Sequence, residues 1–446
     1  MENLKKLIAK YASAGPRYTS YPTALDFSKD ADRENLKRLA FSPLPDASLY
    51  VHIPFCANLC CFCGCTTSLG RDSKSADDYL DLIEKEFSAW QKCGLPRRLL
   101  RQIHFGGGSP NFLLPEQIER LGAIIRKFCD IANGCEFSAE LDPRTLTGEK
   151  IDAFAKIGIN RASLGIQDTN PDVQKAINRI QPFEKDIEAV KLLRACGIKS
   201  VNIDLIYGLP LQTPKTFAQT LKNALELNPD RIALFGYAHV PWVKPAQKSL
   251  EQWAIPTSDE KAQLFLEGKS AFENAGYEFI GLDHFAKPDD KLIEARRNGT
   301  LHRNFQGYST HAGIDLFAVG LTSISETKTS YRQNCKAMPD YKKAVEDGIL
   351  PIEKGIVLNS EDILRRAVIM DIMCALKVNY GNYGVDFPKK FAEALEKLKA
   401  MEEDGLVELK EEGFRVSPTG RLFLRNIAML FDGRIAQHKS TFSKTV

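Results

Sequence analysis

The chain has 446 residues, 43% of them hydrophobic, so it can bury a sizeable core but is too long for one compact domain of ordinary size. Its 60 basic and 57 acidic residues leave a formal net charge of only +3, which argues against nucleic acid or an anionic membrane as a partner. No apolar segment follows Met1 and no apolar run is long enough to cross a bilayer, so we expect neither a signal peptide nor a membrane span.

Residues 1–46 precede the first strong strand and are predicted to form an N-terminal arm. Within it, Gly15–Ala24 holds two prolines and two tyrosines, which disfavour a helix and favour an ordered, extended stretch. The Arg17 guanidinium can form a bidentate pair with a carboxylate, and a tyrosine ring can lie against a flat ligand. The arm is therefore either close to a substrate, with Arg17 as a contact, or a linker packed on the surface.

Strands and amphipathic helices are predicted to alternate from about residue 47 to residue 240. Repeated units of this kind imply an α/β fold with a parallel sheet and right-handed crossovers, and six units fit an incomplete (β/α)6 barrel. The predicted strands are Ser48–Ile53, Gln102–Phe105, Glu136–Leu141, Ala162–Ile166, Val201–Ile206 and Ile232–Tyr237, and the helices are Ser75–Lys92, Pro115–Cys129, Leu146–Lys156, Phe183–Ala195 and Thr213–Leu225.

The loops that follow these strands are expected to carry the chemistry, because loops at the carboxyl ends of the strands build the active site of a parallel barrel. The first strand leads into a cysteine-rich loop. The second leads into Gly106–Pro110, whose glycines would let the backbone approach a ligand, although the run lacks the spacing of a dinucleotide fold or a P-loop. Each later strand brings small or polar residues to or near its end: Glu140, Gln167, Asp204, and Ala238 with His239.

Five of the 11 cysteines lie within Cys56–Cys65. The spacing Cys56-x3-Cys60-x2-Cys63 offers three thiolates from one loop, and thiolates favour zinc or an iron–sulfur cluster. Closed zinc sites usually have four ligands, often as two pairs, and no partner pair with that spacing occurs elsewhere in the chain. A [4Fe–4S] cluster is also held by cysteine thiolates, and three of them would leave one iron open, so the loop alone allows such a cluster, a zinc module, or a buried or disulfide-paired group of cysteines. Cys61 is predicted to point away from the cluster.

The other six cysteines are scattered, and an odd total without a secretion signal indicates reduced thiols and a cytoplasmic location. We expect each of these six to act as a small buried hydrophobe: Cys93, Cys129, Cys135, Cys196, Cys335 and Cys374.

The pattern is weaker from residue 241 to 352, where a loop at Pro241–Pro245 and a helix over Thr257–Ala275 are predicted. Residues 353–446 are predicted to be a separate, mainly helical domain, so that 47–352 comprises the barrel and its extension. Ser360 is the expected cap of its first helix. Its elements are a helix to about Leu376, a helix over Asp386–Asp404, a hairpin of Leu406–Leu409 and Phe414–Val416, and a helix over Pro418–Leu430.

This order of elements resembles a winged helix, whose usual role is DNA binding. The balanced charge argues against that role, since fold alone does not fix function, and we expect a lid or cap over the barrel instead. A nucleic-acid binder that acts through this domain is the alternative.

The cysteine spacing resembles the signature of the radical S-adenosylmethionine (SAM) enzymes, in which the open iron binds the amino and carboxylate groups of SAM. The longer string over residues 52–65, His-Ile-Pro-Phe-Cys-x3-Cys-x-Phe-Cys-x-Cys, resembles one family, the oxygen-independent coproporphyrinogen III oxidases (dehydrogenases) of haem biosynthesis. Cys65 matches an extra cysteine of that family that is not a ligand. The resemblance extends from the Pro16 segment to the C-terminal domain.

The resemblance implies a set of site residues. Cys56, Cys60 and Cys63 hold the cluster, and Tyr50, Gly107 and Glu140 contact the SAM molecule bound to it. Gly106–Pro110 is similar to the Gly-Gly-x-Pro motif that receives the SAM amino group, with Ser109 where the family more often has threonine. Further matches to SAM positions, some of them around a second SAM molecule, are Phe62, Gly108, Ser109, Gln167, Arg179, Asp204, Ala238 and Ile324.

Two residues are candidates for catalysis. Gln306 lies in Phe305–Tyr308, which resembles an element near the active site of the family, so it either handles substrate or protons or satisfies the loop backbone. His52, beside the cysteine loop, is a candidate for catalysis or for packing.

The resemblance implies that the protein converts two propionates of coproporphyrinogen III to vinyl groups and yields protoporphyrinogen IX. A SAM-derived 5′-deoxyadenosyl radical removes the hydrogen, and loss of carbon dioxide and an electron follows. We expect a [4Fe–4S] cluster, one or two SAM molecules, an electron donor such as flavodoxin or ferredoxin, and a monomer. The alternative is a radical SAM haem chaperone or a haem-processing methyltransferase of related sequence.

Overall fold

The computed structural model describes residues 2–40, 46–70, 72–437 and 442. Contacts group the chain into two compact units. The larger comprises Ser28–Gly276 and Gly313–Val357, and the smaller comprises Met1–Phe27, Tyr277–Ala312 and Leu358–Val446. The predicted domain boundaries at residues 46/47 and 352/353 remain predictions, because a group of contacts does not test independent folding.

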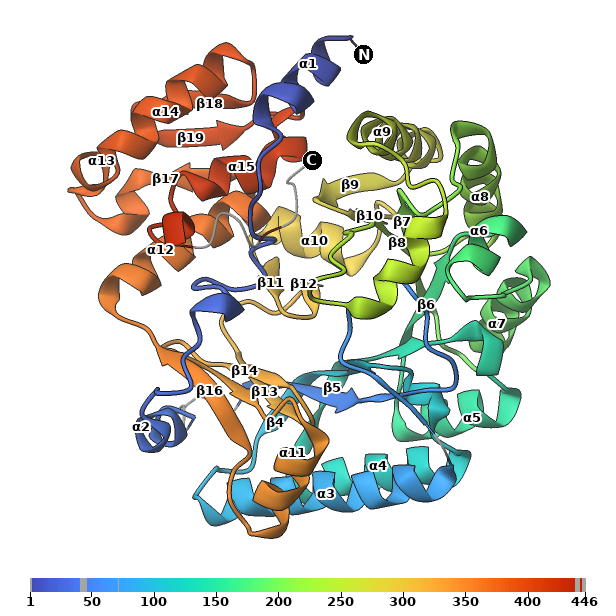
Figure 1. The fold of residues 1–446 in the computed structure, drawn as a ribbon. Helices are drawn as coiled ribbons and strands as arrows, with labels where there is room; N and C mark the ends of the chain where they lie inside the picture. Colours follow the sequence, from blue (N-terminus) through green and yellow to red (C-terminus); the bar gives the residue numbers. More distant parts are fainter. Residues whose placement is uncertain (1, 41–45, 71, 438–441, 443–446) are drawn as a thin grey trace. The chain divides into compact units, whose positions relative to one another are not determined.

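The six predicted strands are present and lie side by side in the larger unit, in the order β1-β4-β5-β6-β7-β8 with every neighbouring pair parallel (Figure 1). Among the described strands no pairing closes this sheet, so the predicted incomplete α/β barrel is confirmed. The strands are β1 Asp46–Ile53, β4 Leu99–Gly107, β5 Asp130–Leu141, β6 Arg161–Gln167, β7 Ser200–Tyr207 and β8 Arg231–Gly236.

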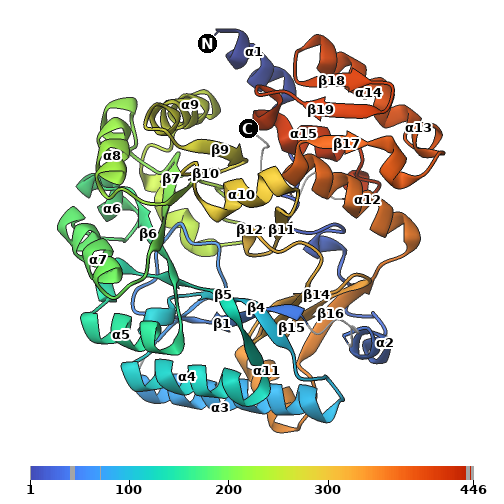
Figure 2. The same ribbon diagram turned by 180° about the vertical axis from the view of Figure 1, so that it is seen from behind.

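The connecting helices lie along one face of this sheet (Figures 1 and 2). In β6, Ala162, Leu164 and Ile166 are buried, whereas Ser163 and Gln167 on the opposite face are partly exposed. This alternation follows from the two-residue period of a strand, and it leaves a polar face turned away from the apolar core. The helices are α3 Ser73–Lys92, α4 Pro115–Phe128, α5 Gly148–Ile157, α6 Pro171–Ala176, α7 Phe183–Ala195, α8 Pro214–Glu226 and α9 Ser258–Asn274.

The sheet continues beyond β1 through strands that the sequence pattern did not reveal. β13 (Asp315–Val319) pairs in parallel with β1. β14 (Ile324–Glu326), β15 (Ser330–Asn334) and β16 (Ile352–Val357) follow it in antiparallel pairs. These strands are short, and β15 is buried although it carries Arg, Gln and Asn side chains, so no apolar alternation marks it. Helices α2 (Arg33–Arg38), α10 (Lys291–Asn298) and α11 (Met338–Glu346) were likewise not predicted.

A buried carboxyl group ties α3 to this added part of the sheet. The Glu86 carboxylate accepts hydrogen bonds from Gly320 N (2.8 Å), Asn334 Nδ2 (2.7 Å) and the Tyr341 hydroxyl (2.7 Å). Burial raises the pKa of Glu86 to about 7, although these hydrogen bonds oppose the shift. Glu86 therefore stabilises the larger unit least when it is ionised.

We expect Glu86→Gln to change how stability depends on pH. Because the folded pKa of about 7 exceeds the ordinary value of 4.5, the wild-type protein loses stability as the pH rises through that interval. The shift corresponds to about 3 kcal/mol, a loss that the glutamine variant does not have. Urea denaturation of both proteins at about pH 5 and about pH 8 measures it. Parallel changes in the two proteins would contradict this role for Glu86.

In the smaller unit the Gly15–Ala24 segment is not a regular helix, as predicted, although α1 (Glu2–Tyr11) precedes it. The Tyr18 hydroxyl donates to Asp432 (2.9 Å), and Arg425 Nε donates to the Pro16 carbonyl oxygen (3.0 Å). The arm is therefore fastened to the C-terminal part of the chain.

The C-terminal elements differ in detail from their prediction. Asn359, rather than Ser360, caps α12 (Ser360–Met370), because its side chain accepts the backbone N–H of Asp362. The predicted helix over Asp386–Asp404 is interrupted at Phe391. The predicted hairpin gains a third strand, and the last helix begins only after a 3-10 turn. The elements are β17 Lys377–Asn379, α13 Phe387–Lys390, α14 Ala392–Glu403, β18 Val407–Lys410, β19 Gly413–Val416 and α15 Leu424–Met429.

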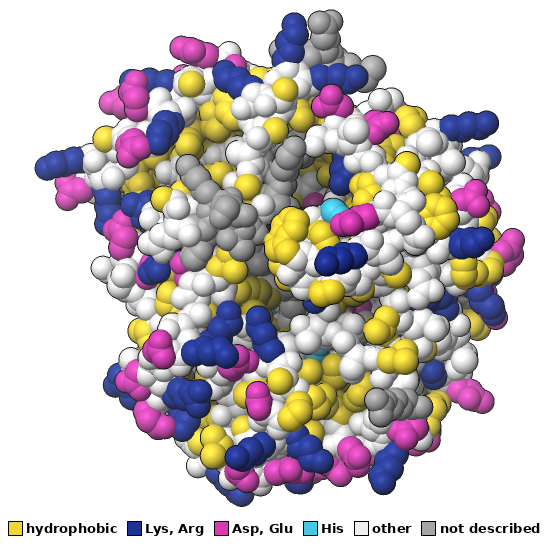
Figure 3. All heavy atoms as spheres, in the orientation of Figure 1, with side chains coloured by type: hydrophobic (Ala, Val, Ile, Leu, Met, Phe, Trp, Pro, Cys, Tyr) yellow, Lys and Arg dark blue, Asp and Glu magenta, His cyan; other side chains and the backbone are white. Residues whose placement is uncertain are grey.

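Basic and acidic side chains are interspersed over the face in Figure 3, in keeping with the small net charge. No described helix has the length and apolar character needed to cross a bilayer. The scattered cysteines are only partly as predicted. Cys129, Cys135 and Cys374 are buried, but Cys93 is exposed at the end of α3, and Cys196 and Cys335 are partly exposed.

Candidate functional site

The cysteine loop follows β1 at the carboxyl edge of the sheet. β1 ends at Ile53, and a short strand, β2 (Phe55–Cys56), pairs with β3 (Ser68–Leu69). Segments that follow β6 and β8 make four hydrogen bonds to backbone groups of the loop. They are Cys61 N to Ile177 O, Asn178 Nδ2 to Leu59 O, Gln247 Nε2 to Phe62 O and Lys244 Nζ to Cys65 O. The segments after β6 and β8 therefore fix the path of the loop.

All the cysteines of the loop are free thiols, which excludes the disulfide-paired alternative. Cys56, Cys60 and Cys63 are partly buried. Burial raises the pKa of the Cys56 thiol to about 12, and the charges of Cys63 and Cys60 add to the shift, so the three groups lie within electrostatic reach of one another. Cys61 instead packs against an apolar cluster that includes Val173, Ile177, Leu209 and Tyr237, which favours the orientation predicted for it.

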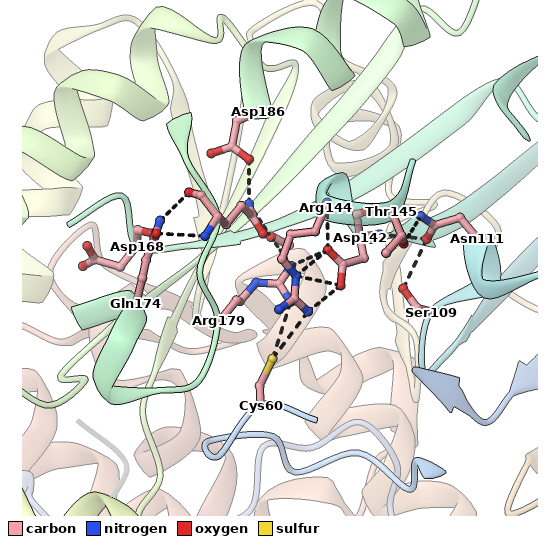
Figure 4. A network of polar contacts seen from close by, with 12 residues as sticks. Cys60, Ser109, Asn111, Asp142, Arg144, Thr145, Asp168, Gln174, Arg179 and Asp186 are labelled. Atoms are coloured by element: carbon pink, nitrogen blue, oxygen red, sulfur yellow. Dashed lines mark hydrogen bonds and ion pairs between the residues drawn. The ribbon is translucent and has the colours of Figure 1, made fainter. Parts of the chain in front are cut away.

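Two guanidinium groups converge on the sulfur of Cys60 (Figure 4). Arg179 Nη1 lies 3.6 Å and Arg144 Nη2 lies 3.9 Å from Cys60 Sγ. Asp142 lies between the two arginines. It accepts from Arg144 Nη2 at 2.6 Å and from Arg179 Nη2 at 3.4 Å. Arg144 was not predicted as a site residue, and its signal in the sequence is its position in the segment that follows β5.

The donor set, three thiols of one loop with two cations beside one of them, suits an iron–sulfur cluster. Among the described residues no group of three or more His, Cys, Asp or Glu side chains is placed to hold one metal ion. The thiolates of a [4Fe–4S] cluster bind different irons, so they need not converge on one point. Cations at the sulfur of a ligand favour the thiolate form that such a cluster requires. The cysteine loop, with Arg144 and Arg179, therefore fits the predicted cluster.

A chain of polar groups lies along the polar face of β1, β4 and β5. The Glu140 carboxylate accepts from Gly107 N (3.2 Å) and contacts His104 Nε2 (3.1 Å). Burial acts against ionisation, but the hydrogen bonds from His104 and Gly107 and the charge of His104 leave the pKa of Glu140 below its ordinary value. The Tyr50 ring stacks on His104, with 5.9 Å between ring centroids. The lowered pKa keeps the Glu140 carboxylate ionised although its site is partly desolvated, and 45% of the side-chain surface remains accessible to a ligand.

His52 is held at both ring nitrogens. Nε2 lies 3.0 Å from the Thr66 carbonyl oxygen and must donate to it, so Nδ1 accepts from the Tyr50 hydroxyl, also at 3.0 Å. Burial lowers the pKa of His52, which keeps the ring neutral. This arrangement favours positioning of Tyr50 and of the cysteine loop over proton transfer by His52.

The glycines at the end of β4 and directly after it are required by close contacts. Gly107 has φ +108°, and a Cβ there would lie 2.5 Å from the His52 ring. A Cβ at Gly108 would lie 2.5 Å from the Phe55 carbonyl oxygen. Ser109 N donates to the same carbonyl oxygen (2.8 Å), and the Ser109 hydroxyl donates to Asn111 Oδ1 (3.2 Å). These contacts bring the glycine loop against the start of the cysteine loop.

Asp204 and Gln167 lie on the neighbouring strands. Asp204 is within β7, not at its end, and accepts from Ser163 Oγ (3.1 Å) and Asn202 Nδ2 (2.8 Å). Burial and then the Glu140 charge raise the pKa of Asp204 to about 7. Gln167 ends β6 with φ +67°, an uncommon conformation for a residue other than glycine.

The other predicted site residues are placed as follows. Phe62 packs against the apolar cluster beside Cys61, Ala238 is exposed after β8, and Ile324 begins β14. Arg17 and Gln306 belong to the smaller unit. Arg17 forms an ion pair with Asp283 there, and Gln306 lies in the turn between β11 (His302–Asn304) and β12 (Gly307–Ser309).

Comparisons with known proteins agree with this geometry. A model of the Radical SAM superfamily matches residues 50–224, and a model of the HemN C-terminal domain matches residues 358–423. The curated oxygen-independent coproporphyrinogen III oxidase of Escherichia coli (strain K12) is 42% identical over 436 residues, covering 97% of this chain and 95% of that protein. The oxidase of Helicobacter pylori (strain ATCC 700392 / 26695) is 42% identical over 449 residues, covering 98% of each.

A solved structure agrees as well. Coproporphyrinogen III oxidase (HemN) from Escherichia coli, described as a radical SAM enzyme, superposes with a TM-score of 0.89 at 41% identity, covering 94% of this chain and 97% of that chain. The chain therefore belongs to the oxygen-independent coproporphyrinogen III oxidase family of radical SAM enzymes, as its cysteine motif predicted.

Proposed function

We propose that this protein oxidatively decarboxylates two propionate side chains of coproporphyrinogen III to vinyl groups in the absence of oxygen, which gives protoporphyrinogen IX. The observation that carries the proposal is the likeness to curated oxidases over 97% of the chain, which takes in the N-terminal arm and the C-terminal elements as well as the cysteine loop. A likeness restricted to the barrel would not distinguish this reaction from those of other radical SAM enzymes.

Membership of the family implies a [4Fe–4S] cluster and SAM as cofactors. When bound and reduced by one electron, they would supply methionine and a 5′-deoxyadenosyl radical, which would take one hydrogen atom from the β-carbon of a propionate; carbon dioxide would then be lost and an external acceptor would take the remaining electron. In this chain Cys56, Cys60 and Cys63 would hold the cluster. Arg144 and Arg179 would donate to the Cys60 sulfur and balance its negative charge.

The polar face of the sheet would hold SAM. Tyr50, Gly107 and Glu140 are proposed to contact the SAM molecule at the cluster, because the Glu140 carboxylate is accessible and can accept from an amino group or from ribose hydroxyls. A second SAM molecule is proposed in contact with some of the other residues matched to the family: Phe62, Gly108, Ser109, Gln167, Arg179, Asp204, Ala238 and Ile324.

Roles for His52, Gln306 and Arg17 follow from the hydrogen bond between His52 and Tyr50 and from the resemblance to the family. His52 is proposed to hold Tyr50 in place, Gln306 to contact substrate, and Arg17 to contact a substrate carboxylate. An external flavodoxin or ferredoxin would supply the electron for SAM cleavage. A cytoplasmic monomer made of an arm (1–46), a barrel with its extension (47–352) and a C-terminal domain (353–446) completes the proposal.

An anaerobic assay tests the function. The reconstituted protein is incubated with SAM, a reductant and coproporphyrinogen III, and the products are separated. We expect carbon dioxide, 5′-deoxyadenosine and a product with two vinyl groups. Bound haem or a methylated tetrapyrrole without release of carbon dioxide would instead support the chaperone or methyltransferase alternative.

A further inference from the structure

Arg303, on the β11–β12 hairpin of the smaller unit, carries a buried charge that forms no ion pair with a carboxylate of the described residues. The residue is 3% exposed. Its Nε donates to the Arg17 carbonyl oxygen (3.3 Å), and its guanidinium lies over the Tyr308 ring, 4.9 Å from the centroid. The Nη1 group has no hydrogen-bond partner among the described residues. A guanidinium has five N–H donors, so most of its bonding capacity remains unused.

The acid in the neighbourhood of Arg303 is already engaged. Asp283 forms an ion pair with Arg17, and it acts on Arg303 only as a nearby charge. Burial, only partly offset by Tyr308 and Asp283, lowers the pKa of Arg303. Another buried arginine of this chain, Arg179, has a carboxylate within 3.4 Å. An unpaired buried cation destabilises a fold, so Arg303 is suited to a partner that arrives from outside.

A second unused donor lies in the same hairpin. Gln306 is in the turn, and its side-chain Nε2 is buried without a partner among the described residues. Its backbone N–H donates to Asn304 Oδ1 (2.9 Å), which fixes the turn. Burial, with the charge of Arg366, lowers the pKa of His302 to about 4, so the imidazole at the start of the hairpin is neutral. Residues 302–309 include no Asp or Glu, so the hairpin offers donors and no competing anion.

We propose that the β11–β12 hairpin binds a carboxylate of the substrate, with Arg303 as the principal donor and Gln306 as a second one. A guanidinium forms charge-assisted, forked hydrogen bonds with a carboxylate, which fix its orientation as well as its position. The inference rests on the proposed function, because the tetrapyrrole keeps propionates that do not react. A carboxylate held in this way would decide which part of the tetrapyrrole is presented for reaction.

Binding of coproporphyrin III, a stable and fluorescent probe, tests the inference without turnover. The probe is titrated into the full-length, cluster-loaded protein under anaerobic conditions. We expect Arg303→Met to raise the Kd about tenfold or more, because a hydrogen bond to a charged group is lost. Arg303→Lys keeps the positive charge but not the forked pair of donors, so its Kd should lie between those of the wild type and Arg303→Met. Gln306→Leu should raise the Kd about threefold or more.

The matched control is Arg297→Met on α10, in the same unit. Its side chain is 59% exposed and pairs with Glu278 at 2.7 Å, so the same change of charge should leave probe binding within about twofold of wild type. The methyl ester of coproporphyrin III supplies the second comparison. Wild type should prefer the acid to the ester, and Arg303→Met should lose most of that preference, which a purely structural role would not cause.

Three results would overturn the inference. One is wild-type affinity for the probe in an Arg303→Met protein with normal circular dichroism and iron content. Another is an equal loss of affinity for acid and ester. The third applies if Arg303→Met does not fold: a Kd of Gln306→Leu for the probe equal to that of the wild type would then contradict the proposed carboxylate site. Failure of the wild type to release carbon dioxide would instead contradict the proposed function, and the probe titrations would still be readable.

Discussion

Replacing Cys56 by alanine is expected to remove the cluster and all release of 5′-deoxyadenosine, whereas Cys61→Ala retains both. The two residues lie in the same loop, but only Cys56 belongs to the proposed ligand set. The side chain of Cys61 packs against the apolar cluster with Val173 and Ile177. Cys60→Ala and Cys63→Ala should behave as Cys56→Ala does, because a cluster that lacks one of its three thiolates is not retained.

The measurements are iron and acid-labile sulfide after anaerobic purification, together with 5′-deoxyadenosine by chromatography. Cys61→Ala is the matched control, since it removes the same side chain from the same loop. Loss of the cluster in Cys61→Ala would show that the ligand assignment is wrong. Zinc without labile sulfide in the wild type would contradict the cluster itself.

Local signals explain how much of this fold could be predicted. The cysteine motif and the alternating strands and helices up to residue 240 depend on residues close together in the sequence, and the structure has those elements where they were expected. β15 was missed because it buries Arg332, Gln333 and Asn334, whose polarity hides the strand from a search for apolar alternation.

The missed site residues depend on contacts between distant parts of the chain. Arg144 touches the sulfur of Cys60, 84 residues away. In the sequence it is an ordinary cation two positions after an aspartate. In the sequence Arg303 could equally be a surface residue, and only the structure shows that it is buried and that its Nη1 group has no hydrogen-bond partner among the described residues. Burial and pairing are properties of tertiary structure, so a single sequence does not reveal them.

Asp142→Ala is expected to have the largest effect on stability outside the cysteines. Asp142 is the carboxylate shared by Arg144 and Arg179, whose side chains are only 12% and 8% exposed. Its removal leaves two buried cations facing each other beside Cys60. We expect the free energy of unfolding to fall by about 3–5 kcal/mol. Iron content should fall as well, because the two donors to the Cys60 sulfur lose the group that orients them.

Urea denaturation under anaerobic conditions measures the loss. The control is Asp130→Ala, which removes an aspartate from an exposed pair with Arg97, the two side chains being 58% and 47% exposed, and should cost no more than about 1 kcal/mol. The double variant Asp142→Ala/Arg144→Met should recover part of the loss, since it removes one of the two unpaired cations, whereas independent effects would simply add. If Asp142→Ala and Asp130→Ala lower the free energy of unfolding equally, Arg144 and Arg179 are hydrated rather than held by Asp142. That result would also contradict the proposal that the two arginines balance the charge of the Cys60 sulfur.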